Sequence, residues 1–439
     1  LKTLRGEKEP VFLIRNGYQA AGYPVRFLEA PDRTVIVRSL LQEVKQQEAG
    51  QVVFVATDSK STSKALTRLL AKETPDRRVL LVNSETSGGE CEREFIQTPD
   101  AVLERDEYDV IICSPSVATG VSIEAQGKIA RVYGIFTGNS STDADMAQAL
   151  GRVREAVERV VWCAQRGSNF SKVSRSTRLQ DLKTQLQHQT TTTVRLLRSS
   201  LREDVTPTVE SYDWSSDPHL NLYCRITADQ NFSMHHLRQA LLVRLKFEGN
   251  GVTVEDWSSD AHLKVLLATA RQEQQAVDAA TLVRAADLTY SEILALEQKE
   301  TMSPEESAAI AKFYLKDFYA LEELTVEDVL WDQEGRRRRE LLNLEAQLVP
   351  ELAQERTAKG LEKQLSWQKG YCPWDVSGAT LRQRVRSEVG LTELLQKLRS
   401  GWSWTKYDLA EYATKARRLA PLIKGLLHFT VNHQMSDTQ

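Results

Sequence analysis

The 439-residue sequence has few cysteines, and none of them stands at the spacing of a metal site. The five cysteines are scattered, odd in number and without a C-x-x-C pair, which argues against a disulfide framework and a zinc site. His235 and His236 have no third ligand at metal spacing, so they do not predict a zinc site either. This pattern is typical of a protein in a reducing cytosol.

Long hydrophobic runs are also lacking. No apolar stretch approaches the roughly 18 residues of a membrane span. The first residues are not followed by the apolar segment of a signal peptide. We therefore expect a cytoplasmic protein with no membrane partner.

Neither sign of charge is in large excess. The chain has 57 basic and 60 acidic side chains and a formal net charge of −3. No overall field therefore identifies a nucleic-acid partner, and any such binding has to come from local patches.

A phosphate-binding loop of the G-x-x-x-x-G-K-[ST] type is absent from the sequence. No apolar strand ends in an Asp-Glu pair suited to holding Mg²⁺. This chain alone is therefore expected to be inactive in ATP hydrolysis.

What the sequence has instead is a regular alternation of apolar runs and amphipathic stretches. Short β-branched runs predict strands, and period-3.6 stretches predict helices. Together they predict a parallel sheet covered on both faces over residues 45–170. The expected strands are 52–55, 79–82, 109–113, 131–136 and 160–164, with earlier strands at 9–14 and 34–37, and the expected helices include 37–47, 61–71 and 90–98.

The rest of the chain has a different character. Residues 171–211 are rich in Ser, Thr, Gln and Arg and indicate a linker with a helical arm. Beyond about residue 212 the strand pattern disappears, and helical periodicity predicts a mainly α-helical region to residue 439. Ser303, Pro304 and Glu306 form a capping-box signature at the start of one of these helices.

A short repeat occurs within the region beyond residue 212. Residues 213–220 recur almost unchanged as residues 256–263. The repeat is either a pair of related sites or two ordinary helix N-caps built from Ser-Ser-Asp, and the second interpretation is favoured.

The densest positive run, residues 336–339, also allows two interpretations. Four consecutive arginines could grip a DNA backbone. Glu334 and Glu340 flank them, so a solvated helix face is equally consistent with the pattern.

Residues 114–124 follow a predicted buried strand and turn abruptly into small and polar side chains. Ligands of open α/β sheets gather where parallel strands end. Thr119 and Ser122 offer hydroxyl groups there, and Gly120 permits close backbone approach. The segment therefore predicts part of a ligand site.

Residues 148–155 place two guanidinium groups just after a glycine. Guanidinium is well suited to neutralising charge on a transferring phosphate. Gln148 precedes Arg152 by four residues, so we expect the two to share a helix face. The alternative is that Arg152 and Arg154 are surface ion-pair partners of Glu155 and Glu158 on an amphipathic helix.

Taken together, three segments resemble the second RecA-like domain of superfamily 2 helicases. Residues 54–60, 114–122 and 148–154 are similar to helicase motifs IV, V and VI in that order. The variant they resemble occurs in herpesvirus origin-binding proteins and in cyanobacterial plasmid replication proteins, and residues 151–159 are most like the latter. The resemblance implies an α/β RecA-like parallel sheet with helices on both faces, followed by a mainly α-helical C-terminal region.

The resemblance also implies a function. It indicates the second motor lobe of an ATP-dependent DNA helicase in plasmid replication initiation, with ATP and Mg²⁺ shared with a first lobe and single-stranded or origin duplex DNA as partner. The implied residues are Arg152 and Arg154 for catalysis, Gly120, Ser122, Gln148 and Gly151 for ATP, and Thr57, Ser59, Ser114 and Thr119 for nucleic acid.

Several alternatives stay open at this point. Motif VI usually has three residues between its glycine and its final arginine, and here it has two, so either Arg152 or Arg154 can be the finger. Because the chain starts with Leu1, we expect a piece whose first lobe is missing, with residues 1–44 as the link to it. The competing interpretations are a non-catalytic DNA-binding or scaffold module with a degenerate RecA-like fold, and an RNA helicase.

Overall fold

The computed structural model divides the chain into two compact units. The sheet unit comprises residues 14–170 and 232–334, and the helical unit comprises residues 1–13, 171–231 and 335–439. The structure describes residues 22–114, 121–201, 203, 209–299, 301–365, 377–398, 401, 403, 405–427 and 429–431.

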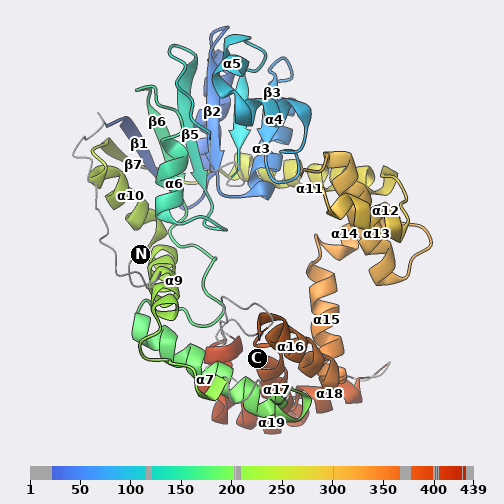
Figure 1. Ribbon diagram of the computed structural model, residues 1–439. Coiled ribbons are helices and arrows are strands. Elements are labelled where there is room, and N and C mark those ends of the chain that lie inside the picture. The colour runs from blue at the N-terminus through green and yellow to red at the C-terminus, as the bar shows by residue number, and fades with distance from the viewer. Residues whose placement is uncertain are drawn as a thin grey trace, which may run out of the picture. The chain divides into compact units, whose positions relative to one another are not determined.

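A seven-stranded sheet forms the centre of the sheet unit (Figure 1). Its strand order is β3-β4-β2-β5-β6-β1-β7, and every neighbouring pair is parallel. The strands are β1 Pro24–Glu29, β2 Val52–Thr57, β3 Val79–Val82, β4 Val110–Cys113, β5 Ile129–Phe136, β6 Arg159–Cys163 and β7 Gly251–Asp256.

Helices cover both faces of this sheet. In β2, Val53 and Val55 pack on one face, and Phe54 and Ala56 pack on the other, as the two-residue period of a strand requires. The predicted fold class, a parallel sheet with helices on both faces and a mainly helical C-terminal region, is confirmed. The first face is covered by α2 Thr34–Gln46, α3 Lys60–Glu73 and α11 Ala261–Arg284, and the second by α4 Glu90–Gln97, α5 Pro99–Glu104, α6 Asp143–Leu150 and α10 Leu237–Phe247.

The predicted strand at 34–37 is wrong, because these residues form the first turn of α2. Thr34 donates from its backbone nitrogen and its hydroxyl to the Asp32 carboxylate, at 3.0 and 2.5 Å. The β-branched residues that suggested a strand are all buried. Burial against the sheet outweighs their weak preference for extended backbone. The other early strand, 9–14, lies outside the described residues.

The sheet is not confined to residues 45–170. Strand β1 and helix α2 come from the segment expected to be a link, and β7 comes from the region where we expected only helices. Strand β7 is a half-exposed edge strand paired with β1. Its side chains therefore lack the buried apolar run by which strands are found in sequence.

A group of three further helices follows α11 in the sheet unit. They are α12 Tyr290–Glu297, α13 Pro304–Tyr319 and α14 Val326–Asp332, and both α13 and α14 contact α11. The capping box at Ser303 is confirmed: its hydroxyl accepts from the Glu306 nitrogen, and the Glu306 carboxylate accepts from the Ser303 nitrogen.

The helical unit is built around α17. This helix contacts α7, α15, α16, α18 and α19, and part of its packing is polar. The Ser387 hydroxyl lies 2.9 Å from Gln347 Nε2 and 3.0 Å from Gln383 Nε2. The helices are α7 Leu179–Leu197, α9 Pro218–His235, α15 Arg336–Leu348, α16 Pro350–Leu365, α17 Ala379–Val389, α18 Leu391–Lys397, α19 Lys406–Arg418 and α20 Ala420–Leu422, with a 3₁₀ turn at Arg198–Ser200 and a π-helical turn at Ile423–Leu427.

Two sequence patterns with open interpretations become clear here. Asp217 accepts from the Leu220 nitrogen at 2.6 Å and Asp260 accepts from the Leu263 nitrogen at 3.1 Å, so both copies of the repeat are helix N-caps. In the arginine run, two members form ion pairs with Glu340, which is the arrangement of a solvated helix face. Among the described residues, no helix has the length and apolar character needed to cross a membrane.

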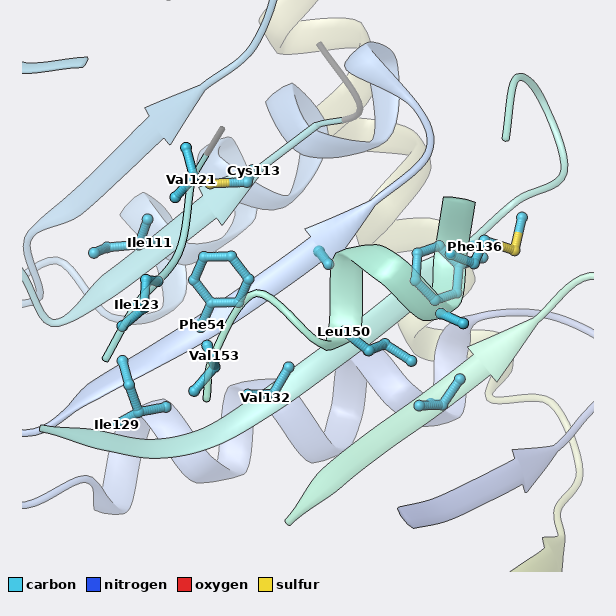
Figure 2. Packing of buried hydrophobic residues seen from close by; sticks show 14 of the residues in the cluster. Phe54, Ile111, Cys113, Val121, Ile123, Ile129, Val132, Phe136, Leu150 and Val153 are labelled. Atoms are coloured by element: carbon cyan, nitrogen blue, oxygen red, sulfur yellow. The ribbon is translucent and has the colours of Figure 1, made fainter. Parts of the chain in front are cut away.

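Phe54 tests how the second face of the sheet is packed. Its side chain is 2% exposed and lies beneath Ile123 and Val153 (Figure 2). We expect Phe54→Ala to lower the free energy of unfolding of the sheet unit by about 3–5 kcal/mol through the cavity it leaves. Amide hydrogen exchange of β2 in increasing urea measures this change. Phe247→Ala, at a side chain that is 86% exposed, is the control and is expected to change stability by less than about 0.5 kcal/mol. Equal effects of the two substitutions would contradict the packing.

Candidate functional site

The two segments singled out in the sequence lie side by side on one face of the sheet. Ile123 pairs with Val153 in a parallel bridge. The Ile123 nitrogen donates to the Arg152 carbonyl and the Arg154 nitrogen donates to the Ile123 carbonyl, both at 2.9 Å. Figure 2 shows Ile123 and Val153 over the strands that carry Phe54 and Val132. The bridge therefore fixes residues 121–124 against residues 152–154.

Arg152 is not on a helix. Helix α6 ends at Leu150, and Gly151 follows as its C-cap, so the expected helix face shared by Gln148 and Arg152 is wrong. The physical reason is the sheet beneath: past Leu150 the chain becomes extended, so that Val153 can be buried next to Ile123.

The Arg152 guanidinium is held at one nitrogen and left with unused donors at the others. Its Nη1 donates to the Val121 carbonyl at 3.0 Å. Its Nε and Nη2 are buried and have no hydrogen-bond partner within the part of the chain that the structure describes. Burial, and then the neighbouring charge of Arg154, lower the pKa of Arg152 below its usual value. Both features favour an anion beside this side chain.

Arg154 is exposed and is oriented by a hydroxyl. Its Nε donates to Ser122 Oγ at 3.2 Å. The alternative in which these arginines pair with neighbouring glutamates is not what the structure has. Glu155 accepts from the Gly127 nitrogen at 2.7 Å, and Glu158 pairs with Arg131 at 3.0 Å.

A hollow of about 400 Å³ gathers four of the expected site residues. Two guanidinium groups and one carboxyl group, that of Glu248, are its charged groups. Burial raises the pKa of Glu248, so its negative charge is disfavoured there. The hollow therefore suits an anionic ligand. It is lined by Gly22, Tyr23, Ala144, Ala147, Gln148, Gly151, Arg152, Arg154, Glu248 and Asn250.

A smaller cavity of about 40 Å³ lies on the other side of Arg152. It brings Arg152 together with Thr57, at the end of β2, and Ser114, just after β4. The Thr57 hydroxyl is buried and has no partner among the described residues. The ends of two parallel strands thus meet Arg152, as expected for a strand-end site.

The remaining expected site residues are placed as follows. Ser59 lines neither hollow, and its hydroxyl caps α3 by accepting from the Thr62 nitrogen at 3.2 Å. Thr119 and Gly120 lie outside the described residues.

Arg159 holds the turn that carries these arginines, and the sequence reasoning missed it. Its side chain is 1% exposed and donates to the carbonyls of Val153, at 2.6 Å, of Glu155, at 2.7 Å, and of Val157. Its guanidinium carbon lies 3.6 Å from the centre of the Tyr23 ring. Burial lowers the pKa of Arg159 to about 10, so the cation persists at neutral pH. The one feature of the sequence that could have identified Arg159 is its place at the start of the apolar run that forms β6.

Asp58 is the second residue that the sequence reasoning missed. Its carboxylate is 2% exposed and accepts from the backbone nitrogens of Thr137, Gly138 and Asn139 at 2.6, 2.7 and 2.9 Å. Gly138 has φ of +77°, a conformation that favours glycine. Asp58 therefore ties the end of β2 to the loop that leads from β5 into α6.

Arg159→Gln tests whether this buried guanidinium positions the turn. Three carbonyls lose their donors, so we expect the amides of Ile123 and Arg154 to exchange at least about tenfold faster, since each unmade buried hydrogen bond costs about 1–3 kcal/mol. Residue-resolved hydrogen exchange measures this change. Amides of β3 should keep their rates, as should all amides in Arg105→Gln, which removes a surface arginine paired with Glu94. Uniform acceleration across the sheet would mean that Arg159 stabilises the fold without positioning the turn.

Comparison with known proteins gives distant relatives. No family model matches the chain. The chain is 27% identical over 246 residues to an uncharacterized protein of Picosynechococcus sp.. The matched region covers 54% of the chain and 24% of the relative. It is 26% identical over 155 residues to a putative helicase/primase complex protein of African swine fever virus, over 35% of the chain and 13% of the relative.

Two solved structures are also similar to parts of the chain. One is Mss116p DEAD-box helicase domain 2 bound to an RNA duplex, with 9% identity and a TM-score of 0.29 over 70% of this chain and 86% of that one. The other is Mss116p bound to single-stranded RNA and AMP-PNP, with 12% identity and a TM-score of 0.26 over 53% and 50%. At these TM-scores the likeness adds nothing to what the strand order shows. The chain spans about a quarter of its first curated relative and 13% of the second, a putative helicase/primase complex protein.

Proposed function

We propose that the sheet unit is the second motor lobe of an ATP-dependent DNA helicase that acts in replication initiation, with plasmid replication as its setting. The helical unit is its C-terminal extension. The similarity to a viral protein described as a putative helicase/primase complex protein supports this proposal. So do the three segments that resemble helicase motifs.

Arg152 is the observation that carries the proposal. Two of its guanidinium nitrogens are buried without a partner among the described residues, and it borders a hollow that holds Arg154, Gln148 and Gly151. A phosphate group would satisfy both nitrogens and offset the mutual repulsion of the two cations. We therefore assign the arginine finger to Arg152. Arg154, which is exposed and oriented by Ser122, would add charge to the same phosphates.

The residues of this lobe fit the phosphate end of ATP, but they do not include all the groups that ATP hydrolysis needs. The sequence has no phosphate-binding loop, and the described residues hold no cluster of three or more His, Cys, Asp or Glu side chains suited to a metal. We propose that a first motor lobe supplies the phosphate cradle and the carboxylates for Mg²⁺. Arg152 would complete the site from this lobe, with Gly120 and Ser122 beside it.

The small cavity suggests how the DNA strand is contacted. Thr57 and Ser114 stand at the ends of adjacent parallel strands and share a cavity with Arg152. Hydroxyl groups at strand ends can bind backbone phosphates without reading sequence. Thr119 would belong to the same set, and Ser59 would act through the first turn of α3, which it caps.

ATP hydrolysis by the longest native open reading frame that contains this chain tests the proposal. We expect turnover stimulated by single-stranded DNA, and a fall of about 10³-fold or more in Arg152→Ala, because an arginine finger contributes on that scale. Arg154→Ala should reduce turnover less. Arg105→Ala is the matched control, since Arg105 is a surface arginine that lines neither hollow.

Other outcomes decide between the alternatives. DNA binding without any turnover would contradict the motor and leave a non-catalytic DNA-binding or scaffold module. Stimulation by oligo(rU) but not by oligo(dT) would make the protein an RNA helicase. Loss of turnover in Arg154→Ala but not in Arg152→Ala would move the finger to Arg154.

A further inference from the structure

Two ring pairs lie at the C-terminal end of α9, outside the three segments that resemble helicase motifs. The rings of Phe170 and His235 have centroids 4.7 Å apart, and those of Phe232 and His236 are 5.2 Å apart. Phe232 is 54% exposed, and His236 is exposed beside it. A large aromatic ring is thus held open to solvent next to an imidazole.

Hydrogen bonds fix these rings to the edge of the sheet where the strands end. The Gly167 nitrogen donates to the Met234 carbonyl at 2.8 Å, and the Asp143 nitrogen donates to Ser233 Oγ at 3.0 Å. Gly167 follows β6, and Asp143 follows the loop after β5. The last turn of α9 is therefore anchored to two strand-end loops.

The same edge carries the residues proposed to contact a nucleic-acid backbone. Asp58 lies between Thr57 and Ser59 and binds the loop after β5. That loop in turn accepts from the Ser168 nitrogen, 2.7 Å from the Gly138 carbonyl. A continuous set of hydrogen bonds, through the Asp58 carboxylate and the Gly138 carbonyl, thus connects the end of β2 with the loop next to the rings.

Charges of both signs lie close to the rings in sequence, because Asp229, three residues before Phe232, is exposed. Arg166 is exposed and immediately precedes Gly167, the residue bonded to α9. The Asp58 carboxylate is already used by backbone donors. An exposed aromatic ring, an imidazole and a nearby guanidinium are the groups on which unpaired bases stack and to which their phosphates bind.

We propose that Phe232 and His236 form a stacking platform for the unpaired bases of a single-stranded nucleic acid, with Arg166 on its backbone. This platform rests on the proposed function: the strand-end residues would bind the phosphates of the strand, and the platform would bind its bases. Stacking uses the ring face common to all bases, so the platform would bind without sequence preference.

Phe247 provides a matched control within the same unit. It is the last residue of α10, the 11-residue helix that starts immediately after His236, and it is 86% exposed. No ring contact involves it in the described part of the chain, and Glu248 follows it. Like Phe232 it is an exposed ring, and it lacks the neighbouring imidazole and the strand-end loops.

The experiment is fluorescence anisotropy of labelled 20-mers without nucleotide, using the longest native open reading frame that contains the chain. The probes are oligo(dT), oligo(rU) and an abasic strand of the same length. We expect Phe232→Ala and His236→Ala each to weaken oligo(dT) binding about tenfold, which is within the range for losing one stacked base. Abasic-strand binding should be unchanged in both variants, Phe232→Trp should restore oligo(dT) binding, and Phe247→Ala should match the unsubstituted protein.

Three outcomes would overturn the platform: no binding of either oligo(dT) or oligo(rU) by the unsubstituted protein, equal losses for the abasic strand and the base-bearing strand, or equal losses in Phe247→Ala and Phe232→Ala. Binding that weakens in Phe232→Ala only for oligo(rU) would retain the platform and assign it to RNA. The motor is tested separately by Arg152→Ala. If turnover depends on Arg152 but Phe232→Ala does not alter binding, only the platform is rejected. If Phe232→Ala weakens binding but no turnover depends on Arg152, only the motor is rejected.

Discussion

The pairing of Ile123 with Val153 is the constraint on which the candidate site depends. Helices α4, α5, α6 and α10 cover only part of this sheet face, and the paired extended segments bury another part of it. Alternate residues of the two paired segments point to the sheet, and the residues between them point away. Because Ile123 and Val153 face the core, Ser122, Arg152 and Arg154 face outward together. A site for charged groups is thus a direct result of covering an apolar sheet.

Two guanidinium groups in the same turn differ in how their burial is compensated. Both terminal nitrogens of Arg159 donate to carbonyls and a ring lies against its face, while its Nε is buried without a partner among the described residues. Arg152 has one carbonyl and two buried nitrogens without partners among the described residues. Burying donors without acceptors is unfavourable unless a ligand provides them. The first arginine therefore leaves one buried nitrogen without a partner and the second leaves two, so the second gains more from a bound anion.

Much of the sheet follows from its sequence. Strands β2 to β6 lie within two residues of the predicted ranges at each end, because they are buried runs of β-branched and aromatic residues. The segment 34–37 has the same composition, but a carboxylate at Asp32 and a buried helix face make it the start of α2. Strand β7 was missed because an exposed edge strand has no buried run. Local pattern therefore identified the central strands and failed where a partner distant in sequence decided the structure.

The candidate site was predicted in part. Its polar groups could be selected because their chemistry is visible in sequence, and the structure places Gln148, Gly151, Arg152 and Arg154 in one hollow. Arg159 and Asp58 could not be selected in this way. Their roles depend on backbone groups that come close only after folding, and sequence does not show where a carbonyl or an amide will point.

Arg152 forms part of the wall of both the larger hollow and the small strand-end cavity. One side chain cannot be rearranged for a ligand in the first without altering the second. Binding in the two places, as we propose it, would therefore be thermodynamically linked, and the factor by which one ligand changes the affinity of the other would have to be the same in both directions. Through the Arg152 guanidinium alone, and without any movement of the sheet, a ligand in the larger hollow would change the affinity of the small strand-end cavity for its own ligand.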